Sequence, residues 1–136
     1  MNTQIYVNLP VKDLDKSKAF FTQLGYTFNP QFTNEKGACM IVSGDIYVML
    51  LQDAFFQTFT KKTISDARKS AEVIVCLSTE SRAKVDELVA KAAAAGGTVP
   101  GKAQDHGFMY GHGFEDLDGH IWELVYLDPT QAPPEA

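Results

Sequence analysis

The sequence predicts an α+β fold in which two β-α-β-β-β modules follow one another. Three observations support this: the order of one strand, one helix and three strands occurs twice, each helical segment has one apolar face, and a glycine ends each helix. A length of 136 residues suits one domain. We therefore expect a single domain over 1–128, with modules at about 3–60 and 71–128 and a flexible tail at 129–136. The helix covers only one face of each sheet, so the sheet of the other module should cover the second face. We therefore expect the two modules to form a curved mixed sheet around a cleft.

The first module begins with a strand and a helix. Residues 4–11 (QIYVNLPV) are rich in apolar and β-branched side chains, which is typical of a strand. A helix is expected over 13–24, because Asp13 is a suitable N-cap and Gly25 can adopt the left-handed conformation after the last turn. One face of this helix contains Leu14, Ser17, Phe20, Phe21 and Leu24.

Three strands and a short helix complete the first module. The strands are expected at 26–32, 38–43 and 46–52, and the last two are joined by the two-residue turn Gly44-Asp45. Phe55, Phe56 and Phe59 indicate a short amphipathic helix. The charged segment 61–71 is expected to connect the modules.

The second module repeats this order. Its strands are expected at 72–78, 98–104, 107–115 and 120–127. A helix is predicted from about 81 to 95 and should end at the pair Gly96-Gly97. Its apolar residues Val85, Leu88, Val89 and Ala92 have the spacing of one helical face.

Composition excludes several classes of partner. The formal net charge is −5 and no cluster of Lys and Arg occurs, so nucleic acid and anionic membrane are not expected partners. No basic leader and no apolar stretch of membrane-spanning length is present, which favours a cytoplasmic location. Cys39 and Cys76 stand in separate apolar runs without metal-type spacing, and we interpret both as reduced core thiols.

The last expected strand contains one carboxylate, Glu123, between apolar neighbours in IWELVYL (121–127). Desolvating a lone carboxylate costs on the order of several kcal/mol unless a partner compensates it. We therefore expect a cation, a histidine or bound water beside Glu123, and we place this residue on the floor of the cleft.

Two stretches carry a resemblance to a known family. They are VNLPVKDLDKSKAFFTQLGY (7–26), similar to a first-strand and first-helix signature, and FEDLDGHIWEL (114–124), similar to a final hairpin. On these stretches the sequence resembles the vicinal oxygen chelate superfamily, which includes glyoxalase I, extradiol dioxygenases and bleomycin-resistance proteins. The resemblance implies the glyoxalase/bleomycin resistance/dihydroxybiphenyl dioxygenase fold. It also implies a homodimer, because family members of this size usually pair two chains.

Enzymes of this superfamily usually hold a divalent metal with His, Glu or Gln ligands from four strands. Glu123 matches the ligand position on the last strand. Tyr6 stands at the first position and Val48 or Met49 at the second, while Glu72, Val73 or Ile74 stands at the third. Because a catalytic site needs at least three protein ligands, the resemblance implies that no metal or other cofactor is bound.

The three histidines lie late in the chain, and His112 is the one expected near Glu123. A two-residue loop at 118–119 places residue 114 opposite Glu123, and a four-residue loop at 116–119 places residue 112 there. In either register His112 and Phe114 share a face with Glu123. A β-bulge at Gly111 or Gly113 would reverse this. His112 would then be a metal ligand, an acid–base partner or a simple ion-pair partner of Glu123, and these two residues are the best catalytic candidates.

The other histidines and polar groups have simpler interpretations. His120 follows the turn and is expected to cap it, and His106 lies in a loop near the mouth of the cleft. Asp116 and Asp118 suit turn chemistry, and Trp122 should face the helix. The candidate ligand-binding residues are Tyr6, Met49, Tyr110, His112, Phe114 and Glu123, with Val125 also facing the cleft.

Three functions remain open from the sequence. The first is a metal-poor small-molecule binding protein of the bleomycin-resistance type, with an aromatic-lined cleft. The second is a divalent-metal-dependent lyase or isomerase of the glyoxalase type, or a dioxygenase, that uses Glu123 with non-standard ligands. The third is an interaction module whose cleft is filled by its own side chains.

Overall fold

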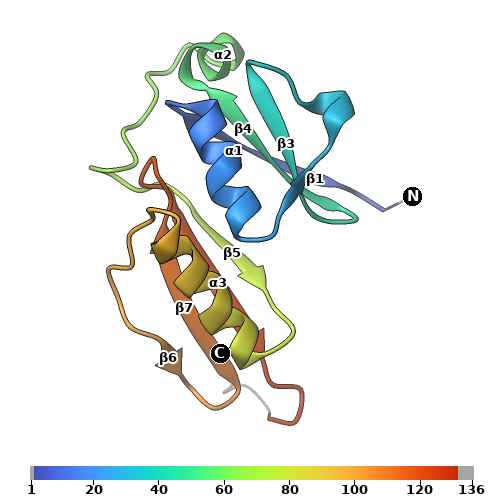
Figure 1. Cartoon of the computed structure of the whole chain (residues 1–136), viewed down its shortest axis with the longest axis vertical. Coiled ribbons are helices and arrows are strands. Elements are labelled where there is room, and N and C mark those ends of the chain that lie inside the picture. The colour runs from blue at the N-terminus through green and yellow to red at the C-terminus, as the bar shows by residue number, and fades with distance from the viewer. Residues whose placement is uncertain (1, 132–136) are drawn as a thin grey trace. The chain divides into compact units, whose positions relative to one another are not determined.

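The computed structural model describes residues 2–131, which form two compact units that divide between Asp66 and Ala67. Each unit contains a four-stranded mixed sheet with a helix packed on one face (Figure 1). The α+β prediction and the two-module order are confirmed. That the two sheets curve around a shared cleft stays a prediction.

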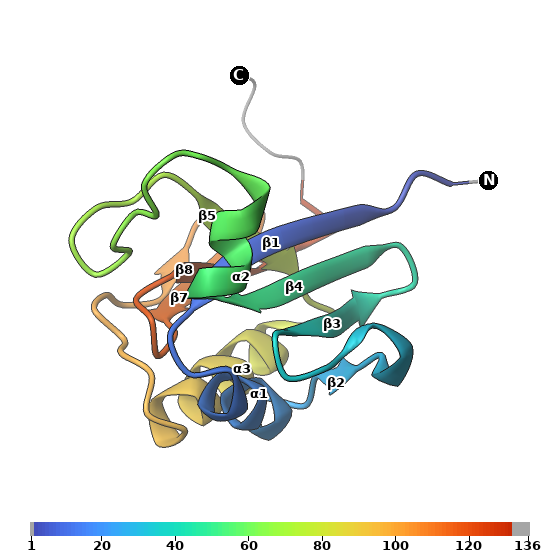
Figure 2. The same ribbon diagram turned by 90° about the horizontal axis from the view of Figure 1, so that it is seen from above.

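The first unit has its strands in the order β1-β4-β3-β2, which Figure 2 shows from above. β1 is parallel to β4, and the remaining neighbours are antiparallel. The strands are β1 (Ile5–Val11), β2 (Thr27–Phe28), β3 (Gly37–Ser43) and β4 (Ile46–Gln52). The helices are α1 (Leu14–Gln23) and α2 (Asp53–Phe56), with single 3-10 turns η1 (Pro30–Phe32) and η2 (Gln57–Phe59).

Helix α1 forms as its sequence predicts. The Asp13 side chain accepts a hydrogen bond from the backbone N–H of Lys16, and Gly25 takes a φ of 103° after the last turn. The predicted inward face is buried, and it includes Phe20 and Phe21, each 1% exposed. These rings meet edge to face, with centroids 4.9 Å apart. Burial of this face fixes α1 on one side of the sheet.

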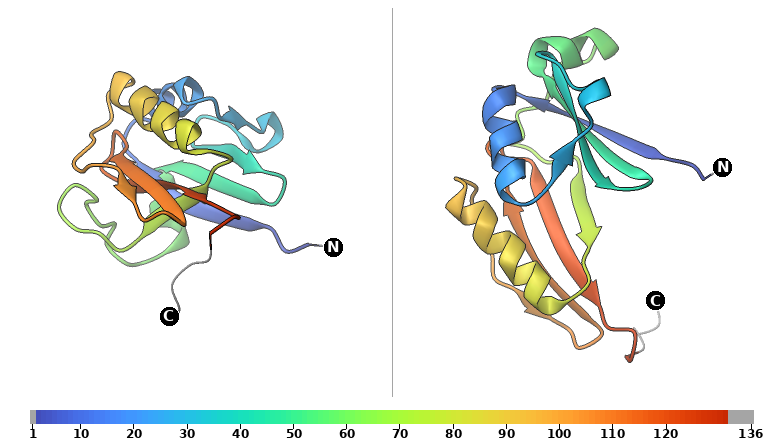
Figure 3. Two further views of the ribbon diagram at one scale, coloured as in Figure 1. Left: turned by 90° about the horizontal axis from the view of Figure 1, so that it is seen from below. Right: turned by 45° about the vertical axis from the view of Figure 1, so that its right-hand side comes forward.

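The second unit has its strands in the order β5-β8-β7-β6, with β5 parallel to β8. They are β5 (Ile74–Ser78), β6 (Gln104–Asp105), β7 (Met109–Glu115) and β8 (Ile121–Leu127). Helix α3 (Arg82–Ala94) lies along β7 and β8 on one face, as the right-hand view of Figure 3 shows. Its predicted inward residues Val85, Leu88, Val89 and Ala92 are all buried.

Two predicted strands are much shorter than expected, and proline explains both. The strand predicted over 26–32 ends at Phe28, because Pro30 begins a 3-10 turn whose N-cap is the Asn29 side chain. The strand predicted over 98–104 reduces to a single bridge from Thr98 to Glu115 and the two-residue β6. Pro100 and Gly101 lie between these parts, and neither residue suits a strand interior.

The C-terminal segment is only partly described. The Asp128 carboxylate accepts hydrogen bonds from the backbone N–H and the hydroxyl of Thr130, which forms a local turn. Residues 132–136, most of the predicted tail, lie outside the described residues. Within residues 2–131, no helix has both the length and the apolar character needed to cross a membrane.

Candidate functional site

The β7–β8 hairpin brings Glu123 opposite Gly113, and this overturns the predicted register. His112 pairs with Leu124 and Phe114 pairs with Trp122. The pairing is regular and contains no bulge; the connecting loop has five residues, 116–120, rather than two or four. Because a shift of one residue moves every side chain to the other face, His112 and Phe114 do not share a face with Glu123.

A buried carboxylate holds this five-residue loop. Asp116 is 5% exposed, and its Oδ1 accepts hydrogen bonds from the backbone N–H groups of Asp118 and His120 at 2.9 and 3.0 Å. Its Oδ2 accepts the indole N–H of Trp122 at 3.0 Å. Burial raises the pKa of Asp116, while the charge of His120 and the Trp122 hydrogen bond act in the opposite direction. The predicted turn chemistry of Asp116 is thus confirmed, and it also sets the register.

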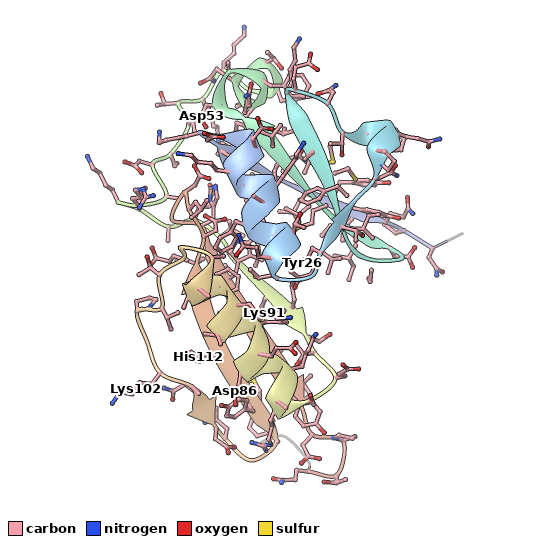
Figure 4. All side chains as sticks on the ribbon, viewed as in Figure 1. Tyr26, Asp53, Asp86, Lys91, Lys102 and His112 are labelled. Carbon is pink, nitrogen blue, oxygen red and sulfur yellow. The ribbon has the colours of Figure 1, made fainter. Side chains whose placement is uncertain are left out.

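Three of the predicted ligand-binding residues, Tyr110, His112 and Phe114, lie on the face of β7 opposite to that of Glu123. The Tyr110 hydroxyl donates to Asp86 of α3 at 2.6 Å, which raises the pKa of Tyr110. Phe114 stacks on Trp122 at an interplanar angle of 6°. His112 Nε2 lies 3.0 Å from the carbonyl oxygen of Gly101, between β7 and the segment that leads to β6 (Figure 4). These side chains hold the unit together, and the predicted His112–Glu123 pair does not form.

The other face of this sheet, called the open face below, carries Glu123. Its residues are Met109, Gly111, Gly113 and Glu115 of β7, Ile121, Glu123, Val125 and Leu127 of β8, and Ile74, Cys76 and Ser78 of β5. Glu123 is exposed, and within residues 2–131 its carboxylate has no hydrogen-bond or ion-pair partner. We expected the Glu123 carboxylate to be desolvated, and within the second unit this prediction is wrong. Its two neighbours on β8, Trp122 and Leu124, are buried on the other face of the sheet.

Cys76 stands beside Glu123 on this face. The two residues are paired in the parallel β5–β8 ladder, and the thiol is exposed. Partial burial raises the pKa of the Cys76 thiol, and the negative charge of Glu123 raises it further. The prediction of a core thiol is confirmed for Cys39, which is buried, and wrong for Cys76.

A pocket of about 260 Å³ opens on this face within the second unit. The sheet contributes Met109, Gly111, Gly113, Ile121, Glu123 and Val125. The segment before β7 forms the opposite rim with Gly101, Lys102, Gln104 and His106, and the lining also includes His112 and Phe114. Apolar side chains beside one carboxylate match the composition of a small-molecule site.

Two glycines at alternate positions of β7 create the floor of this pocket. A Cβ atom at Gly111 would lie 3.3 Å from Cγ1 of Val125, and one at Gly113 would lie 2.7 Å from the carbonyl oxygen of Trp122 and 3.3 Å from Cγ of Glu123. The side chains of Val125 and Glu123 thus lean over backbone that carries no side chain. Glycine at every second position of a strand is the sequence signal for this site, whereas Gly111 and Gly113 were interpreted only as a possible bulge.

Arg82 of α3 positions the rim. Its guanidinium contacts the Asp105 carboxylate at 2.8 Å, donates to the carbonyl oxygen of Gly107 at 2.9 Å, and lies 5.4 Å from the centre of the Tyr110 ring. These contacts hold the turn on which His106 stands. Arg82 lowers the pKa of Asp105, in addition to a larger effect of the backbone N–H of Gly107.

The first unit contains the remaining predicted ligand-binding residues, Tyr6 and Met49. Tyr6 is 47% exposed and stacks on Tyr47 with ring centroids 4.8 Å apart. Met49 shares that sheet face with Tyr47 and pairs with Asn8 of β1. The side chains that β1 and β4 present there therefore include no imidazole and no carboxylate.

Within the second unit, the side chains beside Glu123 do not provide the three ligands of a catalytic metal site. Among residues 2–131, no group of three or more His, Cys, Asp or Glu side chains is arranged to hold one. Next to Glu123 the ladder offers Cys76, whose thiolate is disfavoured by its raised pKa, and Gly113, which has no side chain. A catalytic metal site needs three protein ligands, so we derive no chemical step through a metal here.

The comparisons with known proteins agree with this fold. The model of the family described as bleomycin resistance protein-like N-terminal matches residues 3–43. The solved structure of hypothetical protein SA1046 from S. aureus is 30% identical, with a TM-score of 0.78 over 93% of this chain and 95% of that one. No curated protein matches the sequence.

More distant structures share the fold alone. A glyoxalase-related enzyme from Fulvimarina pelagi has a TM-score of 0.77 at 20% identity, over 93% of this chain and 88% of that one. A glyoxalase/bleomycin resistance protein/dioxygenase family enzyme from Burkholderia phytofirmans PsJN has a TM-score of 0.75 at 16% identity, over 93% and 99%. The chain thus has the fold of structures named as glyoxalase/bleomycin resistance/dioxygenase proteins, and its residues 3–43 match the bleomycin resistance protein-like N-terminal family.

Proposed function

We propose that this protein binds a small organic molecule without a resident metal, and that the pocket on the open face of its second unit is the site. The observation that carries the proposal is the glycine-floored pocket with the unpartnered Glu123 carboxylate in its lining. Such a function is similar to that of the bleomycin-resistance members of the superfamily and differs from that of its metal-dependent enzymes.

The chemistry of the lining supports binding more than catalysis. Met109, Ile121 and Val125 supply apolar surface, whose burial by a ligand is favourable at roughly 25 cal/mol per Å². Glu123 supplies one acceptor that can orient the ligand. Of the two imidazoles in the lining, that of His112 has its Nε2 at hydrogen-bond distance from a backbone oxygen and projects from the face of β7 opposite to that of Glu123.

The test is a titration of ¹⁵N-labelled protein with a library of small aromatic and heteroaromatic compounds, followed by backbone amide shifts. We expect at least one compound class to shift the amides of Gly111, Gly113 and Glu123 and to do so equally with a chelator present. The variant Glu123→Gln should weaken this binding. Glu115→Gln is the matched control, because Glu115 lies on the same face of β7 but outside the pocket lining.

Metal content separates the proposal from its enzymatic alternative. Protein purified without chelator or affinity metal should contain far less than one Ni, Zn, Fe or Mn per chain by elemental analysis. One metal per chain that is lost in Glu123→Gln and kept in Glu115→Gln would overturn the proposal in favour of a metal-dependent lyase, isomerase or dioxygenase. Pairing of two chains stays a prediction, which sedimentation analysis would test.

A further inference from the structure

We infer that the ligand of this pocket is a flat molecule with a cationic, hydrogen-bond-donating group, seated on the glycines of β7 with that group at Glu123. The inference rests on the proposed function and adds the chemical class of the ligand. Two independent features carry it: the shape of the floor and the charge of the lining.

The floor favours a thin, flat ligand. Between Met109 and Glu115 no side chain projects from the open face of β7, because both intervening positions are glycine. The floor there is formed by the peptide backbone, which is buried at Gly111 and partly exposed at Gly113, with β8 on one side and β6 on the other. Two strand spacings make this strip roughly 10 Å wide. Val125 and Glu123 lean over it and limit its depth, so an aromatic ring lying against the peptide groups fits better than a bulky aliphatic group.

The side chains next to Glu123 on β8 are apolar, so its carboxylate is the main polar group in that part of the pocket. Beside Glu123 the sheet presents Ile121 and Val125, which are apolar, so a ligand would partly desolvate the carboxylate when it covers them. A cationic donor on the ligand compensates this cost with a charge-assisted hydrogen bond, whereas a neutral acceptor or an anion does not. Within residues 2–131 no protein cation occupies that position, since Glu123 has no ion-pair partner.

The basic residues of the rim do not compete for this role. Figure 4 shows the Lys102 side chain extending outward from the segment before β6. His112 Nε2 is at hydrogen-bond distance from the Gly101 carbonyl oxygen. His106 stands on the turn that Arg82 holds, with its ring 6.4 Å from that of Phe108. The site therefore presents an unpaired anion next to a flat backbone surface.

Four small probe molecules test the effect of ligand shape separately from the effect of ligand charge. They are 4-aminopyridinium (flat and cationic at pH 7), aniline (flat and neutral), cyclohexylammonium (cationic and puckered) and benzoate (flat and anionic). Dissociation constants are measured from the amide shifts of Gly111, Gly113 and Glu123. We expect 4-aminopyridinium to bind most tightly, by roughly tenfold over aniline, because a hydrogen bond to a charged group contributes that much or more. Benzoate should not shift these amides.

Variants of Glu123 and Gly111 test whether the ligand preference depends on the charge of the lining and on the shape of the floor. Glu123→Gln should weaken 4-aminopyridinium binding by roughly tenfold and leave aniline binding nearly unchanged, and Glu115→Gln should change neither. Gly111→Ala places a methyl group on the floor, close to Val125, and should weaken both flat probes. Gly44→Ala is its control, because a Cβ there meets nothing within 4 Å and lies in the other unit. A well-dispersed amide spectrum verifies that each variant is folded.

The outcomes distinguish the inference from the proposed function. If aniline, cyclohexylammonium or benzoate shifts the pocket amides at least as strongly as 4-aminopyridinium does, the ligand class is wrong and small-molecule binding at this site stands. The same holds if library compounds bind there and all four probes fail. If neither the probes nor the library shifts these amides, both proposals are overturned. An unchanged affinity of 4-aminopyridinium in Glu123→Gln contradicts the role of this carboxylate.

Discussion

Glu123 and Gly113 face each other across the β7–β8 hairpin, and the Cγ atom of Glu123 would lie 3.3 Å from a Cβ atom on Gly113. The glutamate stem therefore rests close to strand backbone that has no side chain of its own. This relationship positions the Glu123 carboxylate in the pocket. It also means that any side chain added at residue 113 would disturb the structure.

Replacing Gly113 by Ala is expected to destabilise the protein by about 1–3 kcal/mol, because the new methyl group would lie 2.7 Å from the carbonyl oxygen of Trp122 and cannot avoid backbone. Gly111→Ala should cost less, since its closest contact is the Val125 side chain at 3.3 Å. Urea unfolding curves of both variants and of Gly44→Ala measure the difference. Equal stability of the two strand variants would contradict the geometry.

The carboxyl of Asp116 should make stability depend on pH in a defined direction. Burial raises its pKa in the folded chain, so its contribution to stability is present below the unfolded pKa and is lost as pH rises through the folded value. The stability of the wild type relative to Asp116→Asn should therefore fall as pH rises from the ordinary aspartate pKa of about 3.9 through the raised value of the folded chain.

The single tryptophan of the chain, Trp122, reports on this group directly, because its indole N–H donates to Asp116. Its fluorescence should titrate with a midpoint above the ordinary aspartate pKa of about 3.9. The variant His120→Gln removes a charge that lowers the pKa of Asp116, so the midpoint should move upward. A midpoint that is unchanged or lower in His120→Gln would show that another group is being observed.

Arg82 is expected to control the mobility of the rim more than the stability of the fold. Its side chain is partly exposed, so Arg82→Lys should change the free energy of unfolding little. Lysine keeps the charge but cannot reproduce the two-pronged contact with Asp105 and Gly107. Hydrogen exchange should accelerate at the amides of 105–108. Lys91→Ala, on the same helix, serves as the control and should leave those amides unchanged.

The two thiols should differ in reactivity towards a maleimide. Cys76 is exposed and Cys39 is buried, so only Cys76 reacts with the native protein. The negative charge of Glu123 contributes to the raised pKa of Cys76, so Glu123→Gln should lower that pKa and accelerate alkylation at pH 7.5. A rate that does not change in Glu123→Gln, with Glu115→Gln as the control, would disprove the coupling between the two side chains.

Local signals in the sequence predicted most of the fold. The Asp13 cap, the glycines after each helix and the apolar faces of α1 and α3 depend on neighbours within a few residues, and the structure confirms them. The prolines at 30 and 100 were equally local signals, but the strands predicted across them were too long. Apolar composition was given more weight there than the missing backbone N–H.

The candidate site was harder to predict because it depends on register. Whether His112 or Gly113 faces Glu123 is decided by the number of residues in the loop, and Asp116 fixes that number through hydrogen bonds to Asp118, His120 and Trp122. No periodic pattern carries this information. Cys76 was misplaced for a related reason: an apolar run in the edge strand β5 still exposes alternate side chains.

The alternation along β7 has an evolutionary consequence. Tyr110 anchors the strand to α3 and stands outside the pocket lining, whereas its neighbours Met109 and Gly111 line the pocket. Natural selection can therefore change what the pocket accepts at one set of positions while it preserves folding at the other. Adaptation to a new compound often costs stability when the same residues serve both purposes. At Tyr110 and Gly111 the two traits depend on separate residues, so a change at Gly111 offers a short path to new specificity.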